Sequence, residues 1–334
     1  MKSIYLVEKD REFNRVYSPA LRENIFAVGG PVPTDKFCKN DVISSPEAFR
    51  DTEYIFSTWS MPVFTEQEIA ACFPSLRAIF YAAGTVQAFA KPFLANGVSV
   101  FSAWAANGVP VAEYTVAQIV LACKGFFATC RLTGQHRRPE AKEVMKKYPG
   151  NYGCKIGLIG VGMIGSMVAE RLKAYRYEVL AFDPFCSEEK AARLGVKLCS
   201  LETIFSECQV ISNHLANNPQ TVGMLDGKLF DLMKESATFI NTGRGAQVVE
   251  ADLAKVLSEK PYATAILDVT YPEPIQEGNP LWEMENVFLT PHIAGSQGDE
   301  CYRMAEYMLE EFVAFTSGKP TRFSVSEAML ATMA

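Results

Sequence analysis

The feature that most constrains this chain is a glycine-spaced turn that follows an apolar run near its middle. Gly160, Gly162 and Gly165 come directly after Ile156–Ile159, and Asp183 stands eighteen residues beyond the last glycine. Gly160 would permit a tight turn, Gly162 would let a pyrophosphate approach the backbone, and Gly165 would let the next helix pack closely on the strand. We therefore predict a strand, a turn, a helix and a second strand that together bind a dinucleotide.

The residues after the turn indicate which dinucleotide binds. A helix predicted over Ser166–Tyr175 directs its N-terminal amides at the phosphates. The next strand, Tyr177–Phe182, delivers Asp183 to accept hydrogen bonds from the adenosine ribose hydroxyls. Because a carboxylate at this position would repel a 2′-phosphate, the sequence predicts NAD rather than NADP.

Length and composition set outer bounds on the class of protein. A chain of 334 residues is long for one core and predicts two domains, and a net charge of −6 argues against a general nucleic-acid or membrane-surface role. No apolar run reaches the roughly 18 residues that a membrane span needs. The nine cysteines contain no C-x-x-C pair, and the first residues do not resemble a signal peptide. We expect a cytoplasmic protein whose cysteines are small buried apolar residues and which holds no metal.

The first part of the chain alternates short strands and helices. A helix predicted over Val111–Thr129 is apolar on nearly all sides, so it should be buried between domains or against a second copy in a homodimer. We interpret Arg131–Gly153 as a solvated, turn-rich connection, although its basic side chains also allow a phosphate patch. The elements predicted before it are Tyr54–Ser57, Thr65–Cys72, Leu76–Tyr81, Val86–Asn96 and Val98–Ser102.

The same alternation continues after the glycine turn and completes one sheet. The last helix, Asp299–Thr316, lies beyond the final strand and should return to the N-terminal domain. The predicted class is α/β: two doubly wound parallel-sheet domains with an interdomain cleft. They are a Rossmann NAD-binding domain (107–297) and a flavodoxin-like substrate domain (1–106 with 298–334). The predicted strands are Val196–Leu198, Val210–His214, Thr238–Asn241, Ala263–Asp268 and Val287–Thr290, with helices Glu188–Leu194, Leu201–Cys208, Lys228–Met233 and Glu250–Ser258 between them.

Four polar side chains follow strands of the second sheet and are candidates for chemistry. Arg244 lies in a glycine-flanked turn, where a guanidinium can clamp a carboxylate, and Glu273 lies between two prolines. His214 and His292 each stand at a strand end. Because the carboxyl ends of parallel strands share one sheet edge, these residues should line the cofactor edge. Taken singly, each also allows a structural interpretation: a turn-capping arginine, an exposed loop carboxylate or a packed histidine.

Several of these pieces together resemble one family. The chain is similar to the D-isomer-specific 2-hydroxyacid dehydrogenases from about Ile55 to about Met304. The matching pieces are the glycine turn with Asp183, Asn241-Thr242-Gly243-Arg244-Gly245, Leu267-Asp268-Val269 leading to Glu273-Pro274, Pro280-Leu281-Trp282-Glu283, and Pro291-His292-Ile293-Ala294-Gly295.

The resemblance implies a role for each candidate. Arg244 would bind and polarise a 2-oxo acid, His292 would exchange a proton with the substrate oxygen, and Glu273 would hydrogen-bond His292 and favour its protonated form. The loop around Gly84 and Thr85 would hold the substrate carboxylate. Further substrate contacts are predicted at Trp59 and Asn107. The cofactor set is Gly160, Gly162, Met163, Ile164, Gly165, Asp183, Pro184, His214, Thr242, Gly243 and Asp268.

Departures from the family pattern leave alternatives open. His214 lacks the usual His-x-Pro pattern, which puts the adenosine-side contacts in doubt, and the loop around Trp59 differs from common members. Trp59 and Trp104 are also compatible with plain core positions. The competing functions are an NAD(H)-responsive corepressor of the same fold, a formate-dehydrogenase-like enzyme, and a β-hydroxyacid dehydrogenase or imine reductase. The sequence does not choose among glyoxylate, hydroxypyruvate, phenylpyruvate and branched 2-oxo acids.

Overall fold

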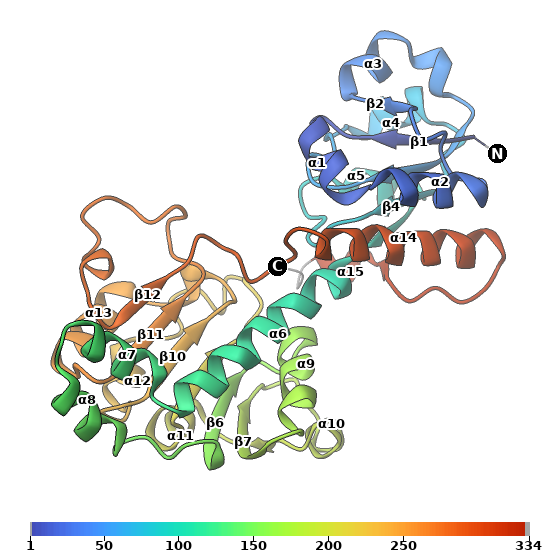
Figure 1. Cartoon of the computed structure of the whole chain (residues 1–334). Helices are drawn as coiled ribbons and strands as arrows, with labels where there is room; N and C mark the ends of the chain where they lie inside the picture. The colour runs from blue at the N-terminus through green and yellow to red at the C-terminus, as the bar shows by residue number, and fades with distance from the viewer. Residues whose placement is uncertain (1, 331–334) are drawn as a thin grey trace. The chain divides into compact units, whose positions relative to one another are not determined.

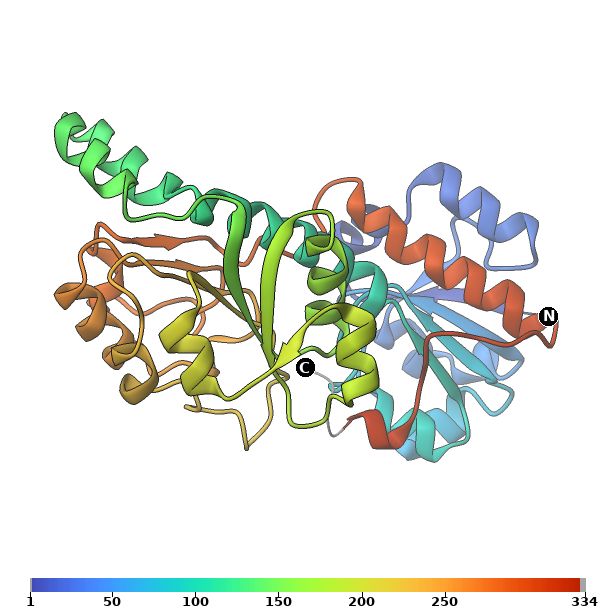
Figure 2. The same ribbon diagram turned by 90° about the horizontal axis from the view of Figure 1, so that it is seen from below.

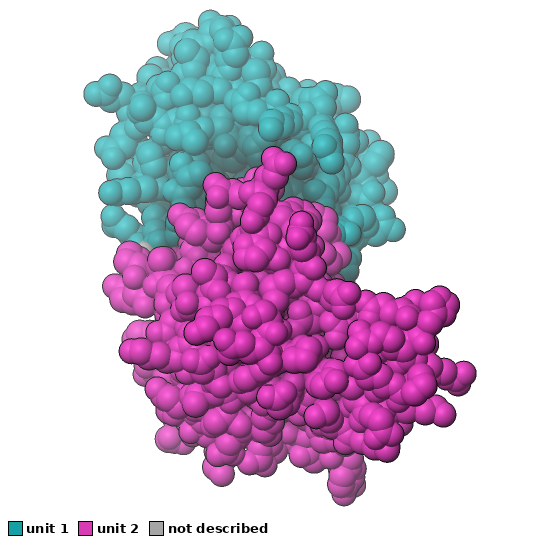
Figure 3. Space-filling view, turned by 90° about the vertical axis from the view of Figure 1, so that its left-hand side faces the viewer, with its two compact units in different colours: residues 1–108, 296–334 teal, residues 109–295 magenta. Residues whose placement is uncertain are grey.

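The computed structural model describes residues 2–330, and the chain divides into two compact units. Unit 1 comprises residues 1–108 and 296–334, and unit 2 comprises residues 109–295, coloured teal and magenta in Figure 3. Residue 1 and residues 331–334, which the sequence assigned to the substrate domain, lie outside the described residues. Each unit contains one sheet, so the predicted two-domain α/β class is confirmed.

Unit 2 is built on a seven-stranded sheet in which every pairing is parallel. The strand order is β12-β11-β10-β9-β6-β7-β8. Counted from β6, this is the doubly wound dinucleotide-binding order, with one further strand beyond β11. The order reverses beside β6, so the turn that follows this strand lies at the switch point of the sheet. The strands are β6 (Tyr152–Ile159), β7 (Arg176–Phe182), β8 (Lys197–Leu198), β9 (Val210–Asn213), β10 (Thr238–Asn241), β11 (Thr264–Leu267) and β12 (Val287–Leu289).

Helices cover both faces of this sheet (Figures 1 and 2). Neighbouring strand residues point to opposite faces: Val210 packs with residues of α6 (Trp104–Cys123), α9 and α10, whereas Ile211 packs with α11, α12 and α13. A strand buried on both faces must be apolar throughout, which explains the continuous runs read from the sequence. The helices are α7 (Phe126–Gly134), α8 (Arg138–Met145), α9 (Met163–Leu172), α10 (Glu188–Leu194), α11 (Leu201–Glu207), α12 (Gly227–Asp231) and α13 (Glu250–Glu259), with 3-10 turns at Gly245–Gln247 and Pro280–Trp282.

Unit 1 contains a six-stranded sheet of order β13-β5-β4-β3-β1-β2. Its parallel part has the flavodoxin-like order, and the short edge strand β13 is antiparallel. One face carries Tyr54, Phe56, Phe80 and Phe101 against α1, α2 and α14, and the other is mostly aliphatic. The strands are β1 (Lys2–Leu6), β2 (Lys36–Phe37), β3 (Thr52–Ser57), β4 (Ala78–Tyr81), β5 (Ser99–Ser102) and β13 (Ser324–Val325).

The helices of unit 1 come from both ends of the chain. The returning helix α14 packs its buried Met304, Met308 and Phe312 on the aromatic face of the sheet. The predicted return of the last helix is therefore observed within this unit. The helices are α1 (Asp10–Val16), α2 (Pro19–Ala27), α3 (Lys39–Ser44), α4 (Glu66–Cys72), α5 (Ala90–Ala95), α14 (Glu300–Thr316) and α15 (Glu327–Leu330), with a 3-10 turn at Pro46–Phe49.

Two sequence predictions about the middle of the chain are wrong in detail. The apolar helix is α6 (Trp104–Cys123), which starts before the predicted residue 111 and stops before residue 129. It stops because Gly125 has a left-handed backbone (φ 66°), from which α7 begins in a new direction. The predicted turn-rich connection, Arg131–Gly153, contains the last four residues of α7 and all of α8, whose Ala141 and Val144 pack in a small cluster of their own.

Among the described residues, no single helix is long and apolar enough to cross a membrane. The helices α6 and α7 meet the length and composition criteria only as a pair bent by 66°. No group of three or more His, Cys, Asp or Glu side chains within residues 2–330 is placed to hold a metal ion.

Candidate active site

The glycine turn lies at the carboxyl end of β6 and has the geometry that its spacing predicts. Gly160 has φ 87°, and a Cβ atom built on it would lie 2.9 Å from the carbonyl oxygen of His214. A Cβ atom on Gly165 would lie 2.0 Å from the carbonyl oxygen of Gly160. Gly160 is therefore required for the turn, and Gly165 for the close approach of α9 to the strand.

Gly162 differs from its two neighbours because a Cβ atom there would meet nothing within 4 Å. It is also the N-cap of α9 and provides no side-chain hydrogen bond to the first amides of that helix. The space beside Gly162 and the N-terminal amides of α9 thus suit a bound pyrophosphate.

Asp183 follows the end of β7, beside this turn. Its Oδ2 accepts a hydrogen bond from the Val161 amide at 2.9 Å, and its Oδ1 accepts one from the Phe185 amide at 2.9 Å. Each carboxylate oxygen keeps a further acceptor position. Both oxygens can thus still receive a ribose hydroxyl, while Phe185 next to them is 95% exposed.

His214 lies against the same turn and carries an unsatisfied polar atom. Its Nε2 is 2.9 Å from the Ser212 hydroxyl, whereas its Nδ1 is buried and has no partner among the described residues. Burial lowers the pKa of His214 to about 4, so the imidazole is neutral near pH 7. A buried nitrogen without a partner beside an open glycine turn is consistent with a site that a ligand completes. The residues present therefore fit a dinucleotide.

A buried amide network shapes the turn that presents Arg244. Asn213 Nδ2 donates to Asn241 Oδ1 at 3.0 Å and to Gln247 Oε1 at 2.6 Å. Asn241 Oδ1 also accepts from the Gly243 amide, and Gln247 Oε1 accepts from the Arg244 amide. Both backbone amides of the turn are thus bound by side chains that are themselves held in place.

Arg244 is a half-buried cation at this edge. Its guanidinium donates to the Gly243 carbonyl at 2.8 Å, and its remaining N–H groups allow a bidentate contact with a carboxylate. Burial lowers the pKa of Arg244, while the nearby Glu273 acts in the opposite direction. Since an arginine stays charged over the physiological range, Arg244 supplies a fixed positive charge.

Glu273 and His292 form a direct pair. His292 Nδ1 is 2.7 Å from Glu273 Oε1, so the carboxylate can accept a hydrogen bond from a protonated Nδ1. This contact leaves Nε2 of the imidazole for a second partner, and the His292 side chain is 46% exposed. Glu273 contacts His292 directly, and its charge also raises the pKa of Arg244. The three predicted catalytic residues therefore lie in one cluster within unit 2.

Asp268 holds the loop that carries His292. Its carboxylate accepts from the Thr290 hydroxyl at 2.6 Å and from the amides of Ile293 and Ala294 at 2.7 and 2.9 Å. His292 itself has a left-handed backbone (φ 57°), which is uncommon for a residue with a side chain. The carboxylate therefore keeps the imidazole in a conformation that the loop alone would rarely adopt.

The remaining predicted cofactor residues lie in unit 2 along the same segments. Met163 and Ile164 open α9, Pro184 follows Asp183, and the Thr242 hydroxyl is 3.3 Å from that of Thr115 in α6. Their contacts with a cofactor, like those of Gly243 and Asp268, stay a prediction.

The predicted substrate residues outside this cluster lie in unit 1. Ser102 Oγ donates to the carbonyls of Ala83 and Gly84, which fixes the loop before Thr85. Asn107 Oδ1 accepts from the Ser296 amide at 3.0 Å. The indole of Trp59 stacks beneath Arg15, whose guanidinium carbon lies 4.8 Å from the ring centre. Substrate contact by these residues stays a prediction.

Sequence reasoning missed two residues that shape the site. Asn213 could have been found, because an amide at the end of the predicted strand Val210–His214 needs a polar partner when it is buried. Gln247 carries no such local signal, since its partners Leu215 and Ala216 lie about thirty residues away.

Comparison with known proteins identifies the family. Residues 116–294 match the family described as "D-isomer specific 2-hydroxyacid dehydrogenase, NAD binding domain". The D-3-phosphoglycerate dehydrogenase of Archaeoglobus fulgidus is 34% identical over 233 residues, which are 69% of this chain but 43% of that protein. The chain thus spans less than half the length of that relative. The glyoxylate reductase of Korarchaeum cryptofilum is 30% identical over 275 residues, or 82% of each protein.

Solved structures with low sequence identity share the fold. The apo D-mandelate dehydrogenase of Rhodotorula graminis superposes with a TM-score of 0.77 at 18% identity over 98% of both chains. The NAD-bound D-isomer specific 2-hydroxyacid dehydrogenase of Lactobacillus delbrueckii ssp. bulgaricus has a TM-score of 0.76 at 21% identity, over 97% of this chain and 100% of that one. Three findings agree: the family match over residues 116–294, the match to the glyoxylate reductase, and the glycine turn with Asp183. The chain therefore belongs to the D-isomer specific 2-hydroxyacid dehydrogenase family, and its cofactor is NAD.

Proposed function

We propose that this protein interconverts a 2-oxo acid and a D-2-hydroxy acid with NAD(H). The observation that carries the proposal is the 2.7 Å contact between His292 Nδ1 and Glu273 Oε1, near the half-buried guanidinium of Arg244. The relatives named glyoxylate reductase and D-3-phosphoglycerate dehydrogenase support the same reaction class.

The three side chains suit the charge changes of ketone reduction. Bound NADH supplies a hydride to the carbonyl carbon of the substrate. Negative charge then develops on the carbonyl oxygen, which the Arg244 guanidinium stabilises. Protonated His292 donates its Nε2 proton to that oxygen, while Glu273 holds the other ring nitrogen and stabilises the imidazolium. In the reverse direction, neutral His292 accepts the hydroxyl proton.

Residues on the turn of β6 would hold the cofactor. The amides at the start of α9 would bind the pyrophosphate beside Gly162, and Asp183 would accept the ribose hydroxyls. Because Asp183 would repel a 2′-phosphate, we expect NADPH to bind much more weakly than NADH.

The experiment that tests this function is NADH consumption, followed by near-ultraviolet absorbance, with a panel of 2-oxo acids. The panel contains glyoxylate, hydroxypyruvate and its 3-phosphate, phenylpyruvate and a branched 2-oxo acid. We expect turnover with at least one acid, a D-configured product where the product is chiral, and little turnover with NADPH. Tight NADH binding without consumption by any acid would contradict the proposal and would favour an NAD(H)-responsive binding protein.

We further propose that the protein is a cytoplasmic homodimer. The predicted interface residues 111–129 form the end of α6 and the start of α7, where Leu121 and Phe126 are exposed. Exposed apolar side chains on neighbouring helices are typical of an interface. Light scattering coupled to size-exclusion chromatography should give about 74 kDa for a dimer, twice the 36.9 kDa of the chain. Leu121→Asp with Phe126→Asp should then shift the mass to that of a monomer.

A further inference from the structure

Two of the nine cysteines lie in contact inside unit 2. Cys123 is the last residue of α6, Cys154 lies near the start of β6, and their sulfur atoms are 3.4 Å apart. Both side chains are buried, and all nine cysteines are free thiols. A disulfide has a sulfur–sulfur distance of about 2.05 Å, so the pair needs a shift of only about 1.4 Å to form one.

The hydrogen bonds around the pair make the two thiols unequal. Cys123 donates its S–H to the Cys154 sulfur, which lowers the pKa of Cys154 and raises that of Cys123. Burial acts in the opposite direction on the pKa of Cys154, and the charge of Lys234 lowers it again, so that the net direction is down. Because the thiolate is the reactive form, Cys154 is the sulfur that reacts first with an oxidant.

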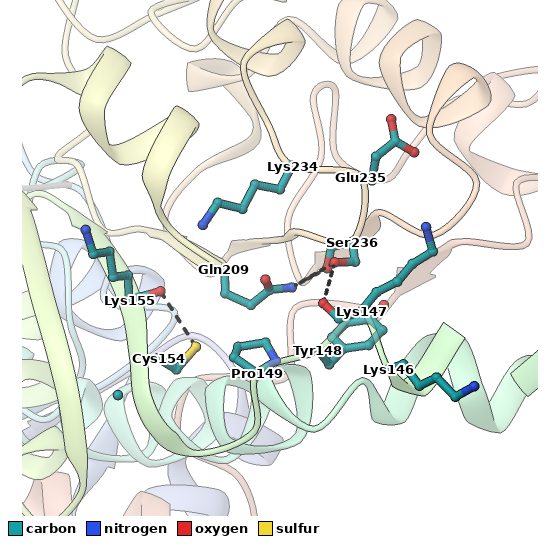
Figure 4. Close-up of a pocket in the computed structure, with 11 residues that line it drawn as sticks. Lys146, Lys147, Tyr148, Pro149, Cys154, Lys155, Gln209, Lys234, Glu235 and Ser236 are labelled. Carbon is teal, nitrogen blue, oxygen red and sulfur yellow. Dashed lines mark hydrogen bonds between the residues drawn. The ribbon is translucent and has the colours of Figure 1, made fainter. Parts of the chain in front are cut away.

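A pocket lined by lysines leads to Cys154. Figure 4 shows this pocket, a hollow of about 540 Å³, with Cys154 in its wall. It lies where β6, β9 and β10 begin, at the sheet edge opposite to the one that carries the glycine turn. Four of the lining residues are lysines, namely Lys146, Lys147, Lys155 and Lys234.

The burial of Cys154 limits what can react with it. The residue is only 1% exposed, so a bulky disulfide does not reach its sulfur, whereas a hydroperoxide of near-water size needs only a local opening of the pocket wall. The charge of Lys234 favours the thiolate during that approach.

We propose that Cys123 and Cys154 are an oxidisable pair which a hydroperoxide, entering through the lysine-lined pocket, converts to an intramolecular disulfide. The Cys154 thiolate attacks one peroxide oxygen, the O–O bond breaks, and with hydrogen peroxide one water leaves as a sulfenic acid forms. The Cys123 sulfur then attacks the sulfenic sulfur, forms the S–S bond and releases a second water. The two thiols lose two hydrogen atoms, and the peroxide is reduced to two waters.

The disulfide would tie the end of α6 to the strand that leads into the glycine turn. It would enclose α7 and α8 in a covalent loop between residues 31 positions apart. A thiol reductant reverses such a bond, so the pair is a reversible modification site at the edge away from the glycine turn. The inference does not depend on the reaction proposed above.

Hydrogen peroxide with peptide mass spectrometry tests the pair. The reduced full chain is treated with peroxide, the remaining thiols are alkylated in denaturant, and the digest is analysed without reduction. We expect a peptide pair linked through Cys123 and Cys154, lighter by two hydrogen atoms and lost after dithiothreitol. Full alkylation of both cysteines, while the exposed Cys130 is oxidised, would overturn the proposal.

Variants test separately the formation of the sulfenic acid, the formation of the disulfide, and the role of the pocket. Cys123→Ser should stop the reaction at a Cys154 sulfenic acid that dimedone traps, whereas Cys154→Ser should leave Cys123 reduced. Lys234→Gln should slow disulfide formation several-fold, and the matched change Lys228→Gln, at an exposed lysine outside the pocket, should not. Equal rates of disulfide formation in the two lysine variants would refute the role proposed for the pocket. A control variant at a cysteine outside the pair, Cys72→Ser, should form the disulfide as fast as the unaltered chain, which would support the specific pairing of Cys123 with Cys154.

Discussion

The two sheets of this molecule have the same kind of topology but are stabilised by different chemistry. In unit 1, the large fully buried rings include Tyr54, Phe56, Phe80 and Phe101 on one face of the sheet. In the described part of unit 2, the large fully buried rings are Phe205, Phe230 and Phe239. The core of unit 1 is therefore much richer in aromatic contacts.

The carboxyl edges of the two sheets also differ, but here unit 2 has the richer set of contacts, and these contacts are polar. In unit 1, hydroxyl groups hold the loops: Thr58 Oγ1 donates to the Ala82 carbonyl at 2.8 Å. In unit 2, amides and a carboxylate with several partners each, such as Asn213 and Asp268, hold the loops that carry Arg244 and His292. We infer that unit 1 is sensitive to loss of volume in its core, and unit 2 to loss of single polar atoms at its edge.

The largest effect should come from His292→Gln, because this change would remove the proposed proton donor of unit 2. We expect kcat to fall by about 10²- to 10⁴-fold while NADH binding is unchanged. The control is His136→Gln: His136 also has a left-handed backbone (φ 62°), so both variants carry the same backbone penalty. NADH oxidation and fluorescence titration give the two quantities. Turnover that survives in His292→Gln would remove His292 from the chemistry.

Phe80→Ala tests the aromatic core of unit 1. Loss of a buried phenyl group should lower the free energy of unfolding by about 3–5 kcal/mol. Phe80 stacks on Phe101 at 5.1 Å between ring centres and meets Phe56 and Phe312 edge-on or tilted. Phe239→Ala in unit 2 removes fewer ring contacts, so its loss in urea unfolding should be smaller. Equal losses would contradict the comparison of the two cores.

The pH dependence of stability tests the buried edge of unit 2. The pKa of His214 is about 4 in the folded chain and 6.5 when unfolded, so the unfolded state binds more protons between these values. Stability without cofactor is thus full above about pH 6.5 and falls by about 3 kcal/mol as the pH drops to about 4. Urea titrations across this range should show a shallower fall in His214→Gln. Parallel curves for the two proteins would show that His214 is not the group responsible.

Asp268→Asn should give the smallest of these effects. An amide cannot accept all the hydrogen bonds of the carboxylate, so we expect a loss of about 1.5–3 kcal/mol and a lower kcat as the His292 loop relaxes. The matched change at the unit 1 edge is Thr58→Val, which removes one hydroxyl and should cost about 1 kcal/mol. Thermal unfolding and NADH oxidation measure both. A larger stability loss in Thr58→Val would reverse the proposed difference between the two edges.

Much of unit 2 could be predicted from sequence because its signals are local. The glycine spacing, the apolar strands and the polar residues just after them each reflect a few neighbouring residues. Strand ends such as Asn241 and Leu267 were predicted within one residue. Residues 2–53, which hold β1 and several short helices, were assigned to the substrate domain, but none of their individual elements was predicted.

The sequence by itself determined the class of fold, the place of the dinucleotide turn and the residue types of the site, because each depends on backbone conformation or periodicity within a few residues. Only the tertiary structure decided the 2.7 Å contact of Glu273 with His292, the amide network of Asn213 and the pairing of Cys123 with Cys154. These contacts join residues that are 19 to 34 positions apart. No local pattern specifies such a contact, since it depends on which strands become neighbours and on how their ends align within the sheet.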